Sequence, residues 1–148
     1  MNVVHVVRQF RPSVGGLEDA VISLVRNQRA AGVDARVVTL DRIFTDLPRR
    51  LPRSGVIDGI PVTRLRWRGS TRYPVAPGVL RAVRGADLIH VHAVDFFFDY
   101  LAATWPLHGK PMVATTHGGF FHTDRRARFK RLWFNIVTRR RSGPTMPS

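Results

Sequence analysis

The first forty or so residues hold the pattern that most restricts the fold of this chain. Residues 3–7 are an apolar run interrupted only by His5, which is typical of a strand buried on both faces. After the pair Gly15-Gly16, apolar residues recur at helical spacing, at Leu17, Ala20, Val21, Leu24 and Val25. A second strand is expected at 35–40. Strand, helix and strand in this order predict a βαβ unit, and therefore a parallel sheet with a right-handed crossover.

The alternation of strands and helices continues along the chain. Asp58-Gly59 is a turn signal between a loop at 41–53 and an alternating segment at 60–67. Then follow a short helix at 79–83, a strand at 87–92, a helix at 95–107, a strand at 111–116 and an amphipathic helix at 125–141. This order predicts an α/β fold, a doubly wound Rossmann-like parallel sheet in one domain of residues 1–141, with residues 142–148 as a disordered tail.

Charge is the strongest signal in the composition. The chain has 24 Lys and Arg against 10 Asp and Glu, a net charge of +14, and Lys110 and Lys130 are its only lysines. Such a surface attracts phosphates, nucleic acid or anionic lipid, although a GC-rich genome also favours arginine over lysine. The absence of cysteine excludes disulfides and thiol catalysis, and no apolar run reaches the length of a membrane span. The start reads as a strand rather than a signal peptide, so we expect a cytoplasmic protein.

Three loops that follow predicted strands carry residues suited to chemistry, because doubly wound sheets bind ligands at the carboxyl ends of their strands. The first holds Gly15 and Gly16 directly before a helix, where free N–H groups suit a phosphate. Glu18 and Asp19 lie in the first turn of that helix and suit its dipole. A tight structural turn is the alternative. The pair matches neither a Walker loop nor a GxGxxG fingerprint, so an ATPase or a standard dehydrogenase is not supported.

The second loop runs from His90 to Asp95. Strand alternation puts His90 and His92 on one face, where they could bind a metal ion with Asp95 as the nearest third ligand. The preferred interpretation is that His92 and Asp95 line a cleft, with capping of the strand and the next helix as the alternative. We expect no metal at this loop.

The third loop follows the strand at 111–116 and combines two imidazoles, two glycines, an aromatic ring and a hydroxyl group. These residues are His117, Gly118, Gly119, Phe120, His122 and Thr123. Their combination suits a hydroxyl-rich ligand that needs hydrogen bonds and a stacking surface. A buried phenylalanine pair with incidental polar neighbours is the alternative.

At these loops the sequence resembles the N-terminal domain of family 4 retaining glycosyltransferases, which have the two-Rossmann-domain GT-B architecture. The resemblance runs from about residue 3 to residue 139. It is carried by FRPSVGGLE, RAAGVDARVVTL, DGIPVTRL, ADLIHVHAVD and above all KPMVATTHGGFFHT. The last segment is most similar to mannosyltransferases that extend polyprenyl-diphosphate-linked oligosaccharides for bacterial exopolysaccharide.

The resemblance implies transfer of a hexosyl group, mannosyl by the closest similarity, from a GDP- or UDP-hexose to a lipid-linked glycan acceptor. It implies that Gly15 and Gly16 lie near the donor diphosphate and that His117 faces the donor sugar as the catalytic residue. Phe120, His122 and Thr123 would contact the acceptor, beside Gly118 and Gly119. The resemblance implies no cofactor and no metal.

The last residues differ from the family pattern. A family member continues after Thr138 into a linker and a second domain, which holds the nucleotide. Here residues 139–148 have no apolar period. We therefore expect that the C-terminal nucleotide-sugar domain is absent, that the chain uses a nucleotide-sugar only beside such a domain, and that it is inactive alone.

Two other functions fit parts of the sequence. A non-catalytic module could use the positive surface to hold an anionic membrane or a lipid phosphate, and the arginines of 125–141 favour a peripheral position at the inner face of the cell membrane. Specific nucleic-acid binding is disfavoured, because the arginines are scattered from Arg8 to Arg141 and no recognition-helix, RRM or KH pattern is present.

Overall fold

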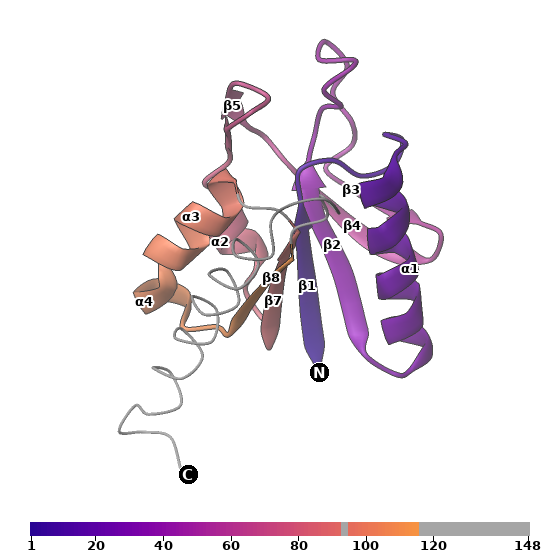
Figure 1. Ribbon diagram of the computed structural model, residues 1–148, viewed down its shortest axis with the longest axis vertical. Coiled ribbons are helices and arrows are strands. Elements are labelled where there is room, and N and C mark those ends of the chain that lie inside the picture. The colour runs from indigo at the N-terminus through magenta and orange to yellow at the C-terminus, as the bar shows by residue number, and fades with distance from the viewer. Residues whose placement is uncertain (93–94, 116–148) are drawn as a thin grey trace, which may run out of the picture.

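The protein has a central, mostly parallel sheet, seen in a computed structural model that describes residues 1–92 and 95–115 (Figure 1). In these ranges six strands follow the order β3-β4-β2-β1-β7-β8. The parallel strands are β1 (Asn2–Val7), β2 (Asp34–Leu40), β4 (Ile60–Leu65), β7 (Leu88–His92) and β8 (Met112–Thr115). At one edge, β3 (Ser54–Ile57) pairs antiparallel with β4. A separate small ribbon joins β5 (Arg68–Gly69) to β6 (Pro74–Val75).

Helices lie on both faces of the sheet. The long helix α1 (Gly16–Ala30) lies on one side of it, and α2 (Val79–Ala82), α3 (Phe96–Ala103) and α4 (Trp105–His108) lie on the other (Figure 1). The apolar core is correspondingly divided in two. One cluster, including Val7, Val21 and Val25, lies between α1 and the sheet, and the other, including Val38 and Phe97, lies on the opposite face. The predicted doubly wound α/β fold is confirmed.

The strand order reverses direction at β1, and this reversal locates the ligand edge. From β1 the chain builds outward to β2 and β4 on one side, then returns to place β7 and β8 on the other. The carboxyl ends of β1 and β7 therefore flank the topological switch point, where open α/β sheets bind their ligands. These ends point toward the upper part of Figure 1, where the long loops lie.

Two predicted elements differ in detail from the structure. The buried face of α1 consists of Glu18, Val21, Ile22 and Val25, whereas Ala20 is exposed and Leu24 is only half-buried. The face is rotated toward Ile22 because that side chain fills the space against the sheet.

The helix predicted at 95–107 is divided at Thr104 into α3 and α4. Pro106 has no N–H to donate to the preceding turn, and the Thr104 hydroxyl donates to the Tyr100 carbonyl at 2.7 Å. Asp95 is the N-cap of α3 rather than its first helical residue.

The turn predicted at Asp58-Gly59 is present and joins β3 to β4 as a hairpin, of which the strand β3 was not predicted. Both residues have positive φ angles, 52° and 77°, which is the geometry of the tight hairpin turns that favour Asp-Gly. Among the described residues, no helix is long and apolar enough to cross a bilayer.

The rotated face of α1 gives a stability test. Ile22→Ala should lower the free energy of unfolding by about 2–5 kcal/mol, because the side chain is almost fully buried and its removal leaves a cavity. Leu24→Ala is the matched control and should cost clearly less, since Leu24 is half-buried. Urea denaturation of both variants measures the difference. A larger loss of unfolding free energy for Leu24→Ala than for Ile22→Ala would contradict the rotated face and support the face predicted from the sequence.

Candidate ligand site at the carboxyl edge of the sheet

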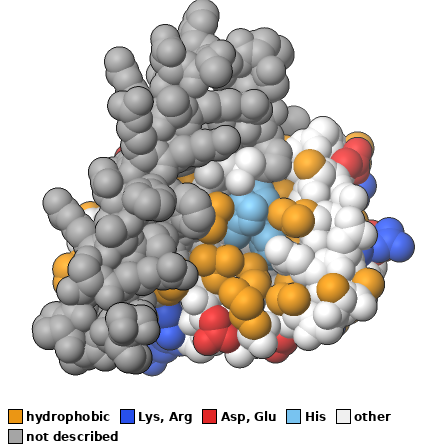
Figure 2. Space-filling model, turned by 60° about the horizontal axis from the view of Figure 1, so that its bottom comes forward, with side chains coloured by type: hydrophobic (Ala, Val, Ile, Leu, Met, Phe, Trp, Pro, Cys, Tyr) orange, Lys and Arg blue, Asp and Glu red, His pale blue; other side chains and the backbone are white. Residues whose placement is uncertain are grey.

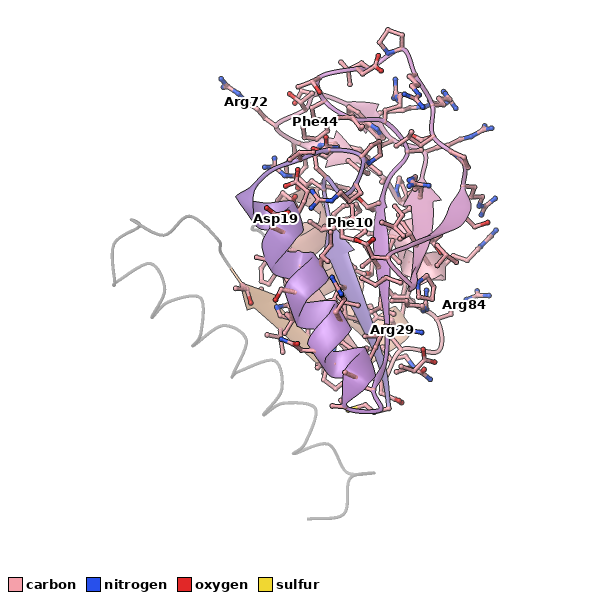
Figure 3. All side chains as sticks on the ribbon, turned by 90° about the vertical axis from the view of Figure 1, so that its right-hand side faces the viewer. Phe10, Asp19, Arg29, Phe44, Arg72 and Arg84 are labelled. Atoms are coloured by element: carbon pink, nitrogen blue, oxygen red, sulfur yellow. The ribbon has the colours of Figure 1, made fainter. Side chains whose placement is uncertain are left out.

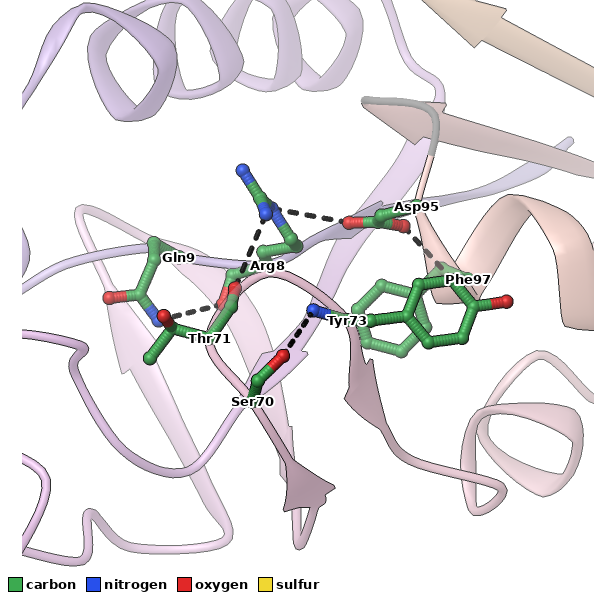
Figure 4. A network of polar contacts seen from close by, with 7 residues as sticks. All are labelled: Arg8, Gln9, Ser70, Thr71, Tyr73, Asp95 and Phe97. Carbon is green, nitrogen blue, oxygen red and sulfur yellow. Dashed lines mark hydrogen bonds and ion pairs between the residues drawn. The ribbon is translucent and has the colours of Figure 1, made fainter.

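An ion pair joins the two strands that flank the switch point. Arg8 is the first residue after β1, and its Nε lies 3.2 Å from Oδ2 of Asp95, which precedes α3 (Figure 4). The Arg8 Nη1 also donates to the Thr71 carbonyl at 3.4 Å, and its guanidinium carbon lies 5.8 Å from the centre of the Phe44 ring. A carboxylate, a carbonyl and an aromatic ring thus hold one cation at the switch point. The Arg8 side chain is 33% exposed, so its charge reaches solvent.

Asp95 is the buried partner of this pair. Its Oδ1 accepts a hydrogen bond from the Phe97 backbone N–H at 3.0 Å, which caps α3. Burial raises the pKa of Asp95 to about 6, although the Phe97 N–H and the Arg8 charge act in the opposite direction. Arg8 Nε and Asp95 Oδ2 lie close together but do not form a hydrogen bond. This carboxyl group therefore titrates close to neutral pH at the switch point.

The glycine pair lies at the start of α1, and the carboxylate of Glu18 lies next to Gly15. The Ser13 hydroxyl donates to Glu18 Oε2 at 2.7 Å, and the side chain of Glu18 is buried. A Cβ on Gly15 would meet Glu18 Oε1 at 3.2 Å, whereas a Cβ on Gly16 would have no atom within 4 Å. A side chain at Gly15 would therefore require the Glu18 carboxylate to move by a few tenths of an ångström, whereas a Cβ at Gly16 would meet no protein atom.

Three histidines form a connected cluster beside the switch point, on the α1 face of the sheet. The register pairs His5 with His90 across β1 and β7, and alternation brings His92 to the same face. The rings of His90 and His92 stack with centroids 4.0 Å apart, and His5 lies 5.1 Å from each. In Figure 2 histidine side chains form a patch bordered by apolar side chains.

Short contacts link the rings of this histidine cluster. His5 Nε2 lies 2.6 Å from the Gln28 amide oxygen, which accepts from it, and in a neutral His5 ring Nδ1 then accepts from His92 Nε2 at 2.8 Å. His90 Nε2 lies 2.6 Å from the Thr115 hydroxyl oxygen. Burial lowers the pKa of His5, which keeps its ring neutral, as this chain of bonds requires.

Metal binding was weighed from the sequence with Asp95 as third ligand, and the structure groups the residues differently. Among the described residues, the side chains whose ligand atoms lie close enough to share an ion are His5, His90 and His92, within 4.8 Å of one another. Asp95 is engaged with Arg8 and the start of α3 instead. Each of the three histidines also has a ring nitrogen within hydrogen-bond distance of a neighbouring side chain.

The predicted site residues divide into two groups, of which the structure describes one. Gly15, Gly16, His92 and Asp95 all follow or end strands whose carboxyl ends share one edge, and His92 and Asp95 are buried rather than open to solvent. The residues of the third loop (His117, Gly118, Gly119, Phe120, His122 and Thr123) lie outside the described residues, as do residues 125–148.

Sequence reasoning missed Arg8, His5 and Gln28. Arg8 stands directly after the first buried strand, and that position alone would have placed it at the switch point. His5 was considered only as an interruption of an apolar run. Its role depends on the pairing of β1 with β7, which joins residues far apart in the sequence.

A comparison with protein families identifies the class of protein. The model of glycosyltransferase family 4 matches residues 14–145, which is most of the chain. The chain therefore belongs to glycosyltransferase family 4, in agreement with its α/β fold.

Its similar relatives are mannosyltransferases. The chain is 60% identical over 139 residues to the GDP-mannose:cellobiosyl-diphosphopolyprenol alpha-mannosyltransferase of Komagataeibacter xylinus, covering 93% of this chain and 35% of the relative. Proteins of the same name are 54% identical in Xanthomonas campestris and 56% identical in Xanthomonas oryzae pv. oryzae, each over 94% of this chain and 37% of the relative. The chain thus spans about a third of the length of these relatives.

The raised pKa of Asp95 predicts a pH effect on stability. The folded chain holds this proton more tightly than the unfolded chain, so the stabilising contribution is fully present below about pH 3.8 and is lost as the pH rises through about 6. Asp95→Asn keeps an acceptor for the Phe97 N–H but does not titrate. Relative to the unchanged protein, the variant should gain about 2 kcal/mol of unfolding free energy between about pH 4 and pH 7.

Urea denaturation at a series of pH values measures this difference, and taking the difference cancels the titration of His5. A variant that instead loses stability relative to the unchanged protein toward pH 7 would show that the charge of Arg8 dominates over burial.

Proposed function

We propose that this chain is the acceptor-side domain of a mannosyltransferase, which moves a mannosyl group from GDP-mannose to a saccharide linked through a diphosphate to a polyprenol. The observation that carries this proposal is the identity of 54–60% to three proteins named for that activity, over 93–94% of this chain. The GGLE loop, the HVHAVD strand end and the THGGFFHT segment all lie inside the matched region.

The reaction breaks the bond between the anomeric carbon of mannose and the donor diphosphate, and negative charge grows on the departing phosphate. Preorganised donors that face such a charge are usually the largest contribution to catalysis. The start of α1 supplies free N–H groups for this purpose, and Gly16 leaves room for the phosphate to approach. Arg8 adds a half-buried positive charge at the same edge.

His117 and its neighbours have proposed roles at the sugars. His117 comes two residues after the end of β8 and would hold the donor mannose at the reaction centre. Phe120, His122 and Thr123, with Gly118 and Gly119, would contact the acceptor saccharide. His92 and Asp95 support this edge from inside the protein, through His5 and Arg8 respectively.

We further propose that transfer needs the part of the relatives that this chain does not span. The 148-residue chain alone should therefore show no transfer from GDP-mannose. Because the acceptor is anchored by its polyprenol and the donor is a nucleotide-sugar, the domain would work at the inner face of the cell membrane, with anionic lipid as a further partner of its positive surface.

A fusion experiment tests the proposal. Residues 1–141 replace the first third of the Komagataeibacter xylinus relative, and mannose transfer from GDP-mannose to cellobiosyl-diphosphopolyprenol is measured. We expect transfer by the fusion. Gly16→Ala should lower the rate of mannose transfer roughly 10–100-fold, because the added methyl group would disturb the contact of the backbone with the donor phosphate. The stability of the fusion should be unchanged or slightly raised, because a Cβ at this position meets no other atom within 4 Å.

Ser23→Ala, at an exposed position of α1, is the matched control and should leave transfer unchanged. Transfer by a correctly folded fusion should also be abolished by His117→Ala. A stable fusion that transfers no mannose, or one unaffected by both substitutions, would contradict the proposal.

A further inference from the structure

A hollow of about 920 Å³ lies on the α2 side of the molecule, outside the switch point described above. Its wall is formed by the carboxyl ends of β2 and β4, the loop at 50–53, and α2 with the residues around it. Of the described residues that line it, six are arginines: Arg50, Arg53, Arg64, Arg66, Arg81 and Arg84. This volume is within the usual range of small-molecule sites.

The positive charge of this arginine hollow is not neutralised by the part of the chain that the structure describes. Asp41 is the only acidic lining residue there, and its Oδ1 lies 3.8 Å from Nε of Arg42, an arginine outside the hollow. None of the six lining arginines belongs to an ion pair between described residues. Guanidinium groups gathered without carboxylates repel one another, and an anion that carries several charges relieves this repulsion.

Arg64 connects the hollow to the glycine loop. Its side chain is buried, and it donates to the Pro52 carbonyl at 3.0 Å and to the Arg11 carbonyl at 3.4 Å. Arg11 belongs to the same loop as Gly15 and Gly16. The Nε of Arg64 is buried with no hydrogen-bond partner among the described residues. Arg64 is thus held by the backbone carbonyls of two loops, and its charge adds to that of the other lining arginines.

We propose that the arginine hollow binds the diphosphate of the polyprenyl-linked acceptor. The inference rests on the proposed function, because the names of the relatives supply the acceptor chemistry: a saccharide joined to a polyprenol through a diphosphate. Arginine suits this group, since the planar guanidinium donates two parallel hydrogen bonds to a phosphate.

Two observations favour the lipid-linked diphosphate over the nucleotide diphosphate. The hollow lies on the α2 side of the sheet, whereas the proposed donor position is the start of α1. The segments that carry Arg50 and Arg53 also expose Leu47 and Val56, which are 37% and 70% accessible and offer apolar surface to an isoprenoid chain.

The test measures binding to the 148-residue chain by calorimetry at physiological salt. The probes are farnesyl diphosphate, farnesyl monophosphate, inorganic pyrophosphate, GDP and phosphatidylglycerol vesicles. Farnesyl diphosphate and pyrophosphate should bind, the monophosphate more weakly. The double variant Arg81→Gln/Arg84→Gln should weaken farnesyl diphosphate binding about tenfold or more, as expected for lost charged hydrogen bonds.

The matched control removes the same charge elsewhere. Arg26 and Arg72 are exposed and do not line the hollow, and Arg72 and Arg84 project on opposite sides of the view in Figure 3. Arg26→Gln/Arg72→Gln should change the affinity less than about twofold. Circular dichroism checks that both double variants fold.

Several results would overturn the inference. Equal weakening by both double variants would mean that diffuse charge attracts the anion. A loss of GDP binding in place of farnesyl diphosphate binding would assign the hollow to the donor, and a loss confined to the vesicles would assign it to the membrane surface. No binding of farnesyl diphosphate by the unchanged chain would also overturn it.

The fusion enzyme separates this inference from the proposed function. If the fusion transfers mannose and Arg81→Gln/Arg84→Gln leaves the KM for the lipid acceptor unchanged, the inference about the hollow fails and the proposed function stands. If the unchanged chain binds farnesyl diphosphate through these arginines but the fusion transfers nothing, the proposed function fails alone.

Discussion

The pairing of β1 with β7 is the interaction on which the site depends. The register sets Val7 beside His92 and His5 beside His90, so residues separated by more than eighty positions share the centre of the sheet. The residues that follow these strands must then meet at one edge, and Arg8 and Asp95 do so as an ion pair. A shift of this register by one residue would turn His90 and His92 to the opposite face and end their contact with His5.

The edge combines buried titratable groups with accessible positive charge. Asp95 and His5 are both shifted by burial toward their uncharged forms, and both are held by hydrogen bonds inside the protein. The positive charge that is accessible to solvent at this edge comes from Arg8 at the switch point and from the arginines that line the hollow beside β4. Such a surface suits an anionic ligand whose recognisable groups are phosphates.

Much of the fold could be predicted from the sequence, because local patterns determine it. The βαβ unit, the Asp58-Gly59 turn and the buried strand at 88–92 follow from periodicity and turn chemistry. The orientation of α1 could not, since Ile22 and Ala20 are both apolar and only packing against the sheet decides between them. The sequence predicts one helix at 95–107, and its division at Thr104, next to the Trp105-Pro106 pair, was not predicted.

The site was only partly predictable for a related reason. Gly15, Gly16, His92 and Asp95 were recognisable as residues that end strands or begin helices. The histidine cluster and the arginine hollow consist of residues that meet through strand order and loop packing, for which a single sequence gives no signal. The family resemblance indicates which ligand to expect, a lipid-linked glycan. The structure indicates which arginines lie together in a position to bind its phosphates.

The central claim is that the carboxyl edge of the sheet binds the lipid-linked acceptor. Backbone amide chemical shifts of the labelled chain, measured during titration with a cellobiosyl diphosphate bearing a short isoprenoid, test it directly. We expect changes to concentrate after the carboxyl ends of β1, β2, β4 and β7, at residues such as Arg8, Asp41, Arg66 and Asp95, with none at Asn2, Asp34 or Leu88. Changes concentrated at the amino ends of these strands would contradict the account.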